Sequence, residues 1–180
     1  MIPGYVVWVL WVPVAAYVGY RHRLTRAGLA RTAGILFLVT YAFWIASVAF
    51  FPLPFSGSHG APLHVNLIPL QDLRASFAGL TARQIVREHV GNLLLLAPVT
   101  FVCAALWPRL RAWKWAFVLG VGWSAAIEIM QLILSLIFGG YRSVDVNDVI
   151  FNLVGALLGY GLFVLSRRRL IRSSNRRAEV

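Results

Sequence analysis

Five long apolar runs constrain this chain more than any other feature of its sequence. A helix needs about 20 mostly apolar residues to cross the hydrocarbon of a membrane. Hydrophobic residues make up 59% of the chain and charged residues only 13%, which is not the balance of a soluble domain. We therefore expect an all-α, polytopic membrane protein whose single domain, residues 1–180, is a bundle of about five transmembrane helices. The runs cover residues 2–20, 33–53, 90–107, 115–138 and 149–166.

The basic residues predict the orientation of these spans. Most of the 17 Lys and Arg residues follow the first, third and fifth runs, and a basic tail, 167–180, closes the chain. Because Lys and Arg beside a span stay preferentially in the cytoplasm, we expect the N-terminus outside and the C-terminus inside. The same clustering assigns the net charge of +11 to orientation and to contact with anionic membrane lipids, and argues against nucleic acid as a partner.

Under this orientation the longest connection, 52–87, lies outside the membrane between spans two and three. Its first part is rich in proline and glycine, which predicts an irregular chain. Its second part, from His64 onward, mixes apolar residues with Asn66, Gln71 and Asp72, and we expect an extended strip that leads into a short surface helix. This loop is either the roof of a site or a passive interfacial linker.

The fourth run carries a polar stripe. Ser124, Glu128, Gln131 and Ser135 are separated by four, three and four positions, which places them on one face of a helix. Glu128 lies near the middle of the span, where a charged side chain costs about 3 kcal/mol even on lenient insertion scales. The stripe is therefore expected to face protein or water rather than lipid.

A second polar face begins the fifth run. Carboxylates at a helix start are favoured by the unpaired backbone amides there, and Ser143 is a candidate cap. Capping alone is thus the alternative interpretation of Asp145 and Asp148, although it does not explain Asn152, a full turn deeper. Two glycines continue the face with the small-residue spacing that allows close helix approach. The members of the face are Asp145, Asp148, Asn152, Gly155 and Gly159.

The third run has polar residues at its predicted outer end. Thr81 and Gln84 match a capping box, so the helix is expected to begin before the membrane. Glu88 and Asn92 then share a face, while Arg87 with Glu88 could equally be a solvated pair. Pro98 is expected to kink the helix, because proline lacks the amide hydrogen that a helix interior needs.

Four blocks, in this order, make the sequence similar to the VanZ family, over about residues 40–165. The blocks are Asn66–Pro69, Gly91–Pro98, Ile127–Gln131, and Arg142–Asp148 with Asn152, Gly155 and Gly159. The chain departs from the family pattern at Thr100, where glycine often stands. The resemblance implies a multi-pass protein of the bacterial plasma or inner membrane, in some members associated with lowered susceptibility to the antibiotic teicoplanin. It implies no established reaction.

Three functions remain open from the sequence. The preferred one is an outer-face site that binds or handles an anionic or amphiphilic envelope component, such as a lipid-linked cell-wall precursor or a lipoglycopeptide, and contributes to glycopeptide tolerance. Guanidinium groups suit phosphate or carboxylate, and amides and carboxyls would orient the headgroup. The candidate ligand-binding residues are Asn66, Arg87, Glu88, Asn92, Glu128, Gln131, Arg142, Asp145, Asp148 and Asn152.

The other two functions are an intramembrane enzyme and a structural scaffold. In the enzyme, Glu128 or the pair Asp145 and Asp148 would act as general base or bind a divalent ion for a lipid-linked phosphate substrate. The chain lacks recognisable catalytic signatures, so no catalytic residue, cofactor or metal is assigned. In the scaffold, the polar stripes would be hydrogen-bonded seams between helices, each contact contributing about 1 kcal/mol.

Overall fold

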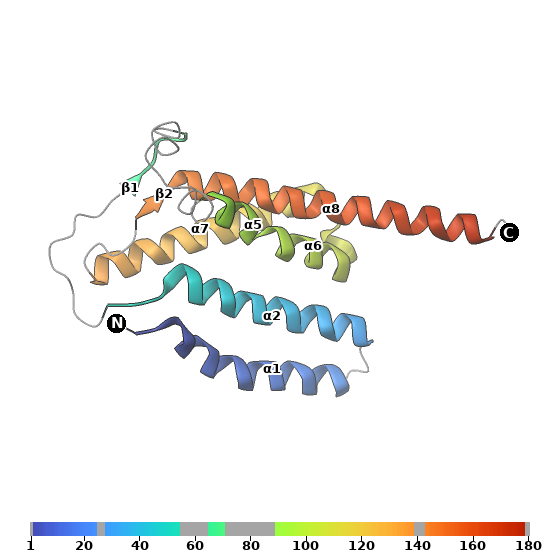
Figure 1. The fold of residues 1–180 in the computed structure, drawn as a ribbon, viewed down its shortest axis with the longest axis horizontal. Helices are drawn as coiled ribbons and strands as arrows, with labels where there is room; N and C mark the ends of the chain where they lie inside the picture. The colour runs from blue at the N-terminus through green and yellow to red at the C-terminus, as the bar shows by residue number, and fades with distance from the viewer. Residues whose placement is uncertain (1, 25–27, 55–64, 71–88, 139–142, 179–180) are drawn as a thin grey trace. The chain divides into compact units, whose positions relative to one another are not determined.

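The protein is helical almost throughout. The computed structural model describes residues 2–24, 28–54, 65–70, 89–138 and 143–178. Two two-residue strands, β1 (Val65–Asn66) and β2 (Val144–Asp145), are the exceptions to an all-α fold in these residues. The helices are η1 (Gly4–Val6), α1 (Val7–Leu24), α2 (Leu29–Phe50), α5 (Gly91–Leu95), α6 (Ala97–Leu106), η3 (Pro108–Leu110), α7 (Trp113–Phe138) and α8 (Val146–Ala178) (Figure 1). The all-α prediction is confirmed.

Three helices are long and apolar enough to cross a membrane: α2, α7 and the part of α8 from Val146 to Ser173. They correspond to the second, fourth and fifth predicted spans, although α2 and α8 begin earlier than expected. The first and third runs also form helices but are not among these three. The helix of the first run continues into basic residues, and the apolar segment Gly91–Leu106 is shorter and divided into α5 and α6.

The described chain forms two compact units, residues 1–71 with 124–147, and residues 72–123 with 148–180. In the first unit α1 packs on α2, where the indole nitrogen of Trp11 donates a hydrogen bond to the Thr40 hydroxyl at 2.9 Å. The Ser47 hydroxyl donates to the carbonyl oxygen of Gly4 at 3.1 Å, which fixes the start of the chain on the end of α2. The hydrogen bond between Trp11 and Thr40 thus satisfies the polar groups of both side chains between otherwise apolar helix surfaces.

In the second unit the third run is broken where the sequence predicts it. α5 ends at Leu95 and α6 begins at Ala97, with Pro98 in the first turn of α6. Proline is tolerated there because the amide groups of a first helical turn have no partner within the helix. The predicted kink at Pro98 is confirmed.

Glycines of α8 allow close contact with α5 and α6. A methyl group added at Gly155 would overlap the backbone carbonyl of Leu93, and one at Gly159 would overlap that of Ala97. At the position where the family pattern often has glycine, the Thr100 hydroxyl lies 2.8 Å from the carbonyl oxygen of Ala156, to which it can donate. Thr100 therefore adds a polar contact between α6 and α8, and the prediction that the two glycines serve helix packing is confirmed.

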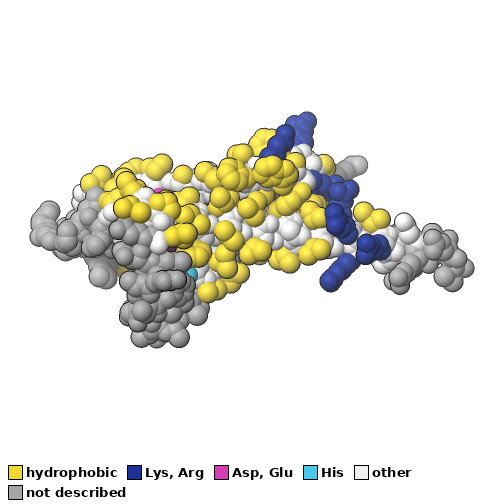
Figure 2. Space-filling view, turned by 90° about the horizontal axis from the view of Figure 1, so that it is seen from above, with side chains coloured by type: hydrophobic (Ala, Val, Ile, Leu, Met, Phe, Trp, Pro, Cys, Tyr) yellow, Lys and Arg dark blue, Asp and Glu magenta, His cyan; other side chains and the backbone are white. Residues whose placement is uncertain are grey.

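The surface has the composition expected beside lipid. Large apolar side chains are exposed along the three long helices, for example Ile129 and Leu136 on α7 and Leu162 on α8. Figure 2 shows hydrophobic side chains over most of the described surface in view, with Lys and Arg gathered in one band. Exposed leucine and isoleucine on this scale are stable in hydrocarbon and unfavourable in water.

Replacing Gly155 by alanine is expected to lower the free energy of unfolding by about 3 kcal/mol, because the added methyl group meets backbone rather than a movable side chain. Gly161 is the matched control: it lies in the same helix, and a methyl group there meets no atom within 4 Å. Reversible SDS titration of both variants in mixed micelles measures the difference. Equal stabilities of Gly155→Ala and Gly161→Ala would contradict the close packing.

Candidate functional site

Asp145 is the centre of a polar cluster at the start of α8. It is the residue before the helix, and its Oδ1 accepts the backbone N–H of Asn147 at 2.8 Å. This is the geometry of an N-cap, in which a side-chain oxygen satisfies one of the free amides of the first turn. The capping role proposed for Ser143 is therefore wrong, because α8 begins at Val146, so that Asp145 and not Ser143 stands at the cap.

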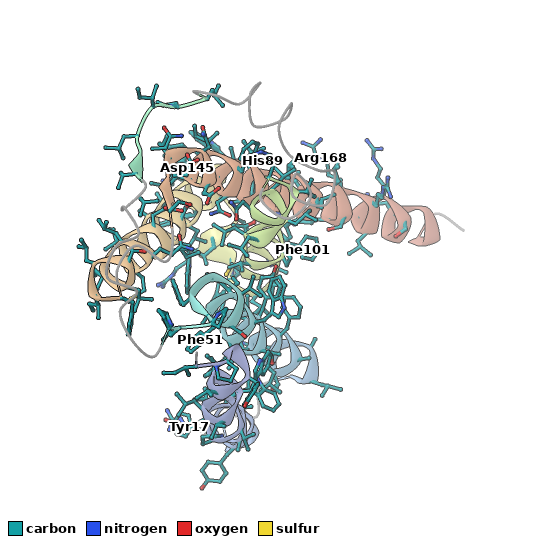
Figure 3. All side chains as sticks on the ribbon, turned by 60° about the vertical axis from the view of Figure 1, so that its left-hand side comes forward. Tyr17, Phe51, His89, Phe101, Asp145 and Arg168 are labelled. Atoms are coloured by element: carbon teal, nitrogen blue, oxygen red, sulfur yellow. The ribbon has the colours of Figure 1, made fainter. Side chains whose placement is uncertain are left out.

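A short parallel ladder brings the loop after α2 to this helix start. Val65 pairs with Val144 and Asn66 with Asp145, so β1 and β2 lie side by side (Figure 1). The Asn66 side-chain amide donates to the same Oδ1 of Asp145 at 3.1 Å, across 79 residues of sequence. Figure 3 shows Asp145 at this end of α8. The two predicted site residues Asn66 and Asp145 are thus in direct contact.

Glu128 joins the cluster from α7. Its side chain is only 7% exposed, and its Oε2 accepts the backbone N–H of Asp145 at 3.1 Å. The prediction that Glu128 faces protein rather than lipid is confirmed, as it is for Ser124 and Ser135 of the same stripe, which are buried as well. A carboxyl group in a membrane helix needs such donors because lipid offers none.

Gln131, the remaining member of the stripe, contacts a different element. Its amide nitrogen donates to the carbonyl oxygen of Ala49 at 3.1 Å. Ala49 lies in the last turn of α2, where carbonyl groups have no partner within the helix. Gln131 therefore satisfies the end of α2, a structural role for a residue that the sequence placed among the ligand-binding candidates.

Asn147 belongs to the cluster but was missed by the sequence analysis. It is buried, and its Oδ1 accepts the backbone N–H of Leu70 at 2.7 Å. Leu70 has a φ of 59°, a left-handed conformation that is rare for leucine and needs support from its surroundings. Asn147 lies off the face shared by Asp145, Asp148 and Asn152, so helical spacing could not identify it. Only the pairing of β1 with β2 brings it to the loop.

The predicted residues of the second unit lie on α5 and α8. Asn92 and Asp148 are partly exposed and Asn152 is buried. Asn152 precedes the glycines that contact α5 and α6, and the ring of the neighbouring Phe151 lies 5.1 Å from that of His89. That these residues converge with Glu128 on one hollow stays a prediction.

Three of the predicted ligand-binding residues, Arg87, Glu88 and Arg142, lie outside the described residues, as does the helix start predicted at Thr81. Within the described ranges, no three His, Cys, Asp or Glu side chains gather in a group that could hold a metal ion. The contacts observed in the described cluster are hydrogen bonds of amide and carboxyl groups. Carboxyl oxygens accept hydrogen bonds from hydroxyl, amide and ammonium donors.

The fold and this cluster define a multi-pass helical membrane protein with a polar junction where a membrane helix begins. A family model, VanZ/LLP1, matches residues 37–167. The chain therefore belongs to the VanZ/LLP1 family, as its sequence blocks predict. No curated protein and no solved structure matches the chain.

Replacing Asp145 by alanine is expected to lower the free energy of unfolding by about 1–2 kcal/mol, because the helix loses its cap and Asn66 loses its acceptor. Ser143→Ala, two positions earlier and outside the cap, should change the stability by less than about 0.5 kcal/mol. Both values follow from denaturant titration of the purified variants. A larger loss in Ser143→Ala than in Asp145→Ala would restore the original capping assignment.

Proposed function

We propose that this VanZ/LLP1 protein binds an amphiphilic component of the bacterial envelope at the outer membrane face. The observation that carries the proposal is the junction of Glu128, Asp145 and Asn66, which puts two carboxyl groups and a carboxamide together at the start of a membrane helix. Asn66 and Asp145 are partly exposed, so they are the members that a headgroup would contact. Buried Glu128 would hold the backbone of Asp145 in place.

The position of the cluster favours an amphiphile over a fully soluble ligand. Between Val149 and Leu165 α8 is apolar except for Asn152 and Tyr160, so a molecule with its headgroup on Asp145 would have its apolar part beside lipid. Hydroxyl and amide donors of a sugar or peptide headgroup complement the carboxyl oxygens. Arg87 and Arg142 are the sequence candidates for an anionic group on the same molecule. A lipid-linked cell-wall precursor and a lipoglycopeptide such as teicoplanin both have this chemistry.

The basic residues support the outer location. Arg109, Lys114 and the exposed arginines 167–169 follow the third and fifth runs, so the rule that positive residues stay in the cytoplasm puts the start of α8 outside. The N-terminus would then also be outside and the C-terminus in the cytoplasm. An outer site would be open to envelope components and to glycopeptides, and binding there would contribute to teicoplanin tolerance.

A structural role for the same residues is the second candidate. Gln131 satisfies the end of α2, and Asp145 caps α8, so each has a structural task that needs no ligand. In a scaffold, the polar residues would fix helix ends and loops while other surfaces act. The two functions differ in what happens when charge is removed but hydrogen-bond acceptors are kept.

The variants Asp145→Asn and Glu128→Gln make this distinction, since each keeps an oxygen that can accept the observed hydrogen bonds and removes the ionisable carboxyl group. Binding predicts that Asp145→Asn weakens the affinity of the protein in lipid nanodiscs for teicoplanin about tenfold, because a hydrogen bond to a charged group becomes one to a neutral amide. Glu128→Gln, which keeps the acceptor for the Asp145 amide, should weaken this affinity less. Cells that express the variants should lose any added teicoplanin tolerance. Titration calorimetry and growth inhibition measure the two effects.

Ile129→Val is the matched control, because Ile129 lies next to Glu128 but is exposed on the apolar side of α7. It should behave as the unchanged protein in both assays. If Asp145→Asn and Glu128→Gln are well expressed and match the control in affinity and tolerance, the binding function is wrong and the scaffold remains.

A further inference from the structure

Residues 67–70, which we name the apolar tip, expose large hydrophobic side chains directly after β1. Leu67 is 71% exposed, and Ile68 and Leu70 are each 56% exposed. They lie in a loop rather than on one of the long helices, where contact with lipid is expected anyway. Three large aliphatic side chains in a short loop are unfavourable in water.

The backbone amides of Ile68 and Leu70 in the apolar tip have hydrogen-bond acceptors within the protein, as a weakly polar environment requires. The amide of Ile68 donates to Oδ1 of Asn66 at 3.2 Å, and the amide of Leu70 donates to Oδ1 of Asn147 at 2.7 Å. Pro69, between them, has no amide hydrogen. Three successive residues therefore carry no amide hydrogen that needs water as an acceptor. Outside water an unsatisfied amide is strongly unfavourable, so this arrangement lowers the cost of insertion.

The tip is also hydrogen-bonded to the start of α8, a helix that can span the membrane. Asn66 contacts Asp145, the residue before α8, and Leu70 is held by Asn147 in the first turn of α8. The helix α8, which is long and apolar enough to cross a membrane, begins at Val146. The first turn of a spanning helix lies where headgroups meet hydrocarbon, so a loop bonded to that turn lies at the same level.

From these three observations we propose that the apolar tip inserts Leu67, Ile68 and Leu70 into the lipid bilayer beside the start of α8. The partner is the lipid itself, at the boundary between glycerol backbone and acyl chain, as for other short interfacial anchors. Insertion would hold β1 and its Asn66 at a fixed depth, level with the capped end of α8. The inference depends on α8 as a membrane span and not on the proposed ligand.

Fluorophore labelling at a single cysteine tests the insertion. In a Cys103→Ala background, Ile68→Cys is labelled with an environment-sensitive dye and the full chain is placed in nanodiscs of neutral and anionic phospholipids. The tip label should show a blue-shifted emission, loss of quenching by aqueous iodide, and strong quenching by lipids with a spin label near the top of the acyl chain. Leu162→Cys, on an exposed apolar position of α8, is the lipid-facing control.

Ser173→Cys is the aqueous control, because Ser173 is exposed beyond the arginine run of α8. If the label at position 68 responds to iodide as the label at position 173 does, the tip lies in water and the proposal is wrong. If it is protected from iodide but not quenched by the spin-labelled lipid, protein covers the tip, and the proposal is equally wrong. Quenching of the label at position 68 by the spin-labelled lipid, together with protection from iodide, supports the insertion of the tip.

Discussion

Every polar group that enters a membrane with this chain must find its hydrogen-bond partner within the chain, because hydrocarbon supplies none. The described polar contacts follow from this requirement. Asp145 satisfies the first turn of α8, and Gln131 satisfies the last turn of α2. Thr100 can donate to a carbonyl of a neighbouring helix. Glu128, within a spanning helix, accepts a backbone amide instead of a water molecule.

The same requirement connects the polar cluster to the apolar loop beside it. Asn66 and Asn147 each satisfy a backbone amide of residues 67–70, and both residues belong to or adjoin the junction around Asp145. A headgroup that contacts Asp145 would therefore meet a surface that is polar at the helix start and aliphatic at the loop. That combination of a polar part and an aliphatic part complements the two parts of an amphiphile.

Regular spacing made much of this fold predictable. The four-three-four pattern around Glu128 identified a buried face of α7, the paired glycines identified the contact of α8 with α5 and α6, and Pro98 identified the helix break. The pairing of β1 with β2 could not be predicted, because a two-residue ladder between segments 79 residues apart has no local pattern. Without that pairing, Asn147 has no visible role and Ser143 is as good a cap as Asp145.

The contact between Asn66 and Asp145 is where loop, helix start and proposed site meet, so a double-mutant cycle on this pair tests the account most directly. Asn66→Ala, Asp145→Ala and the double variant are compared by free energy of unfolding in micelles. The account predicts a coupling energy of about 1 kcal/mol, the contribution of one hydrogen bond to a carboxyl group. Strictly additive losses would show that the two side chains do not interact, and the junction on which the site depends would not exist.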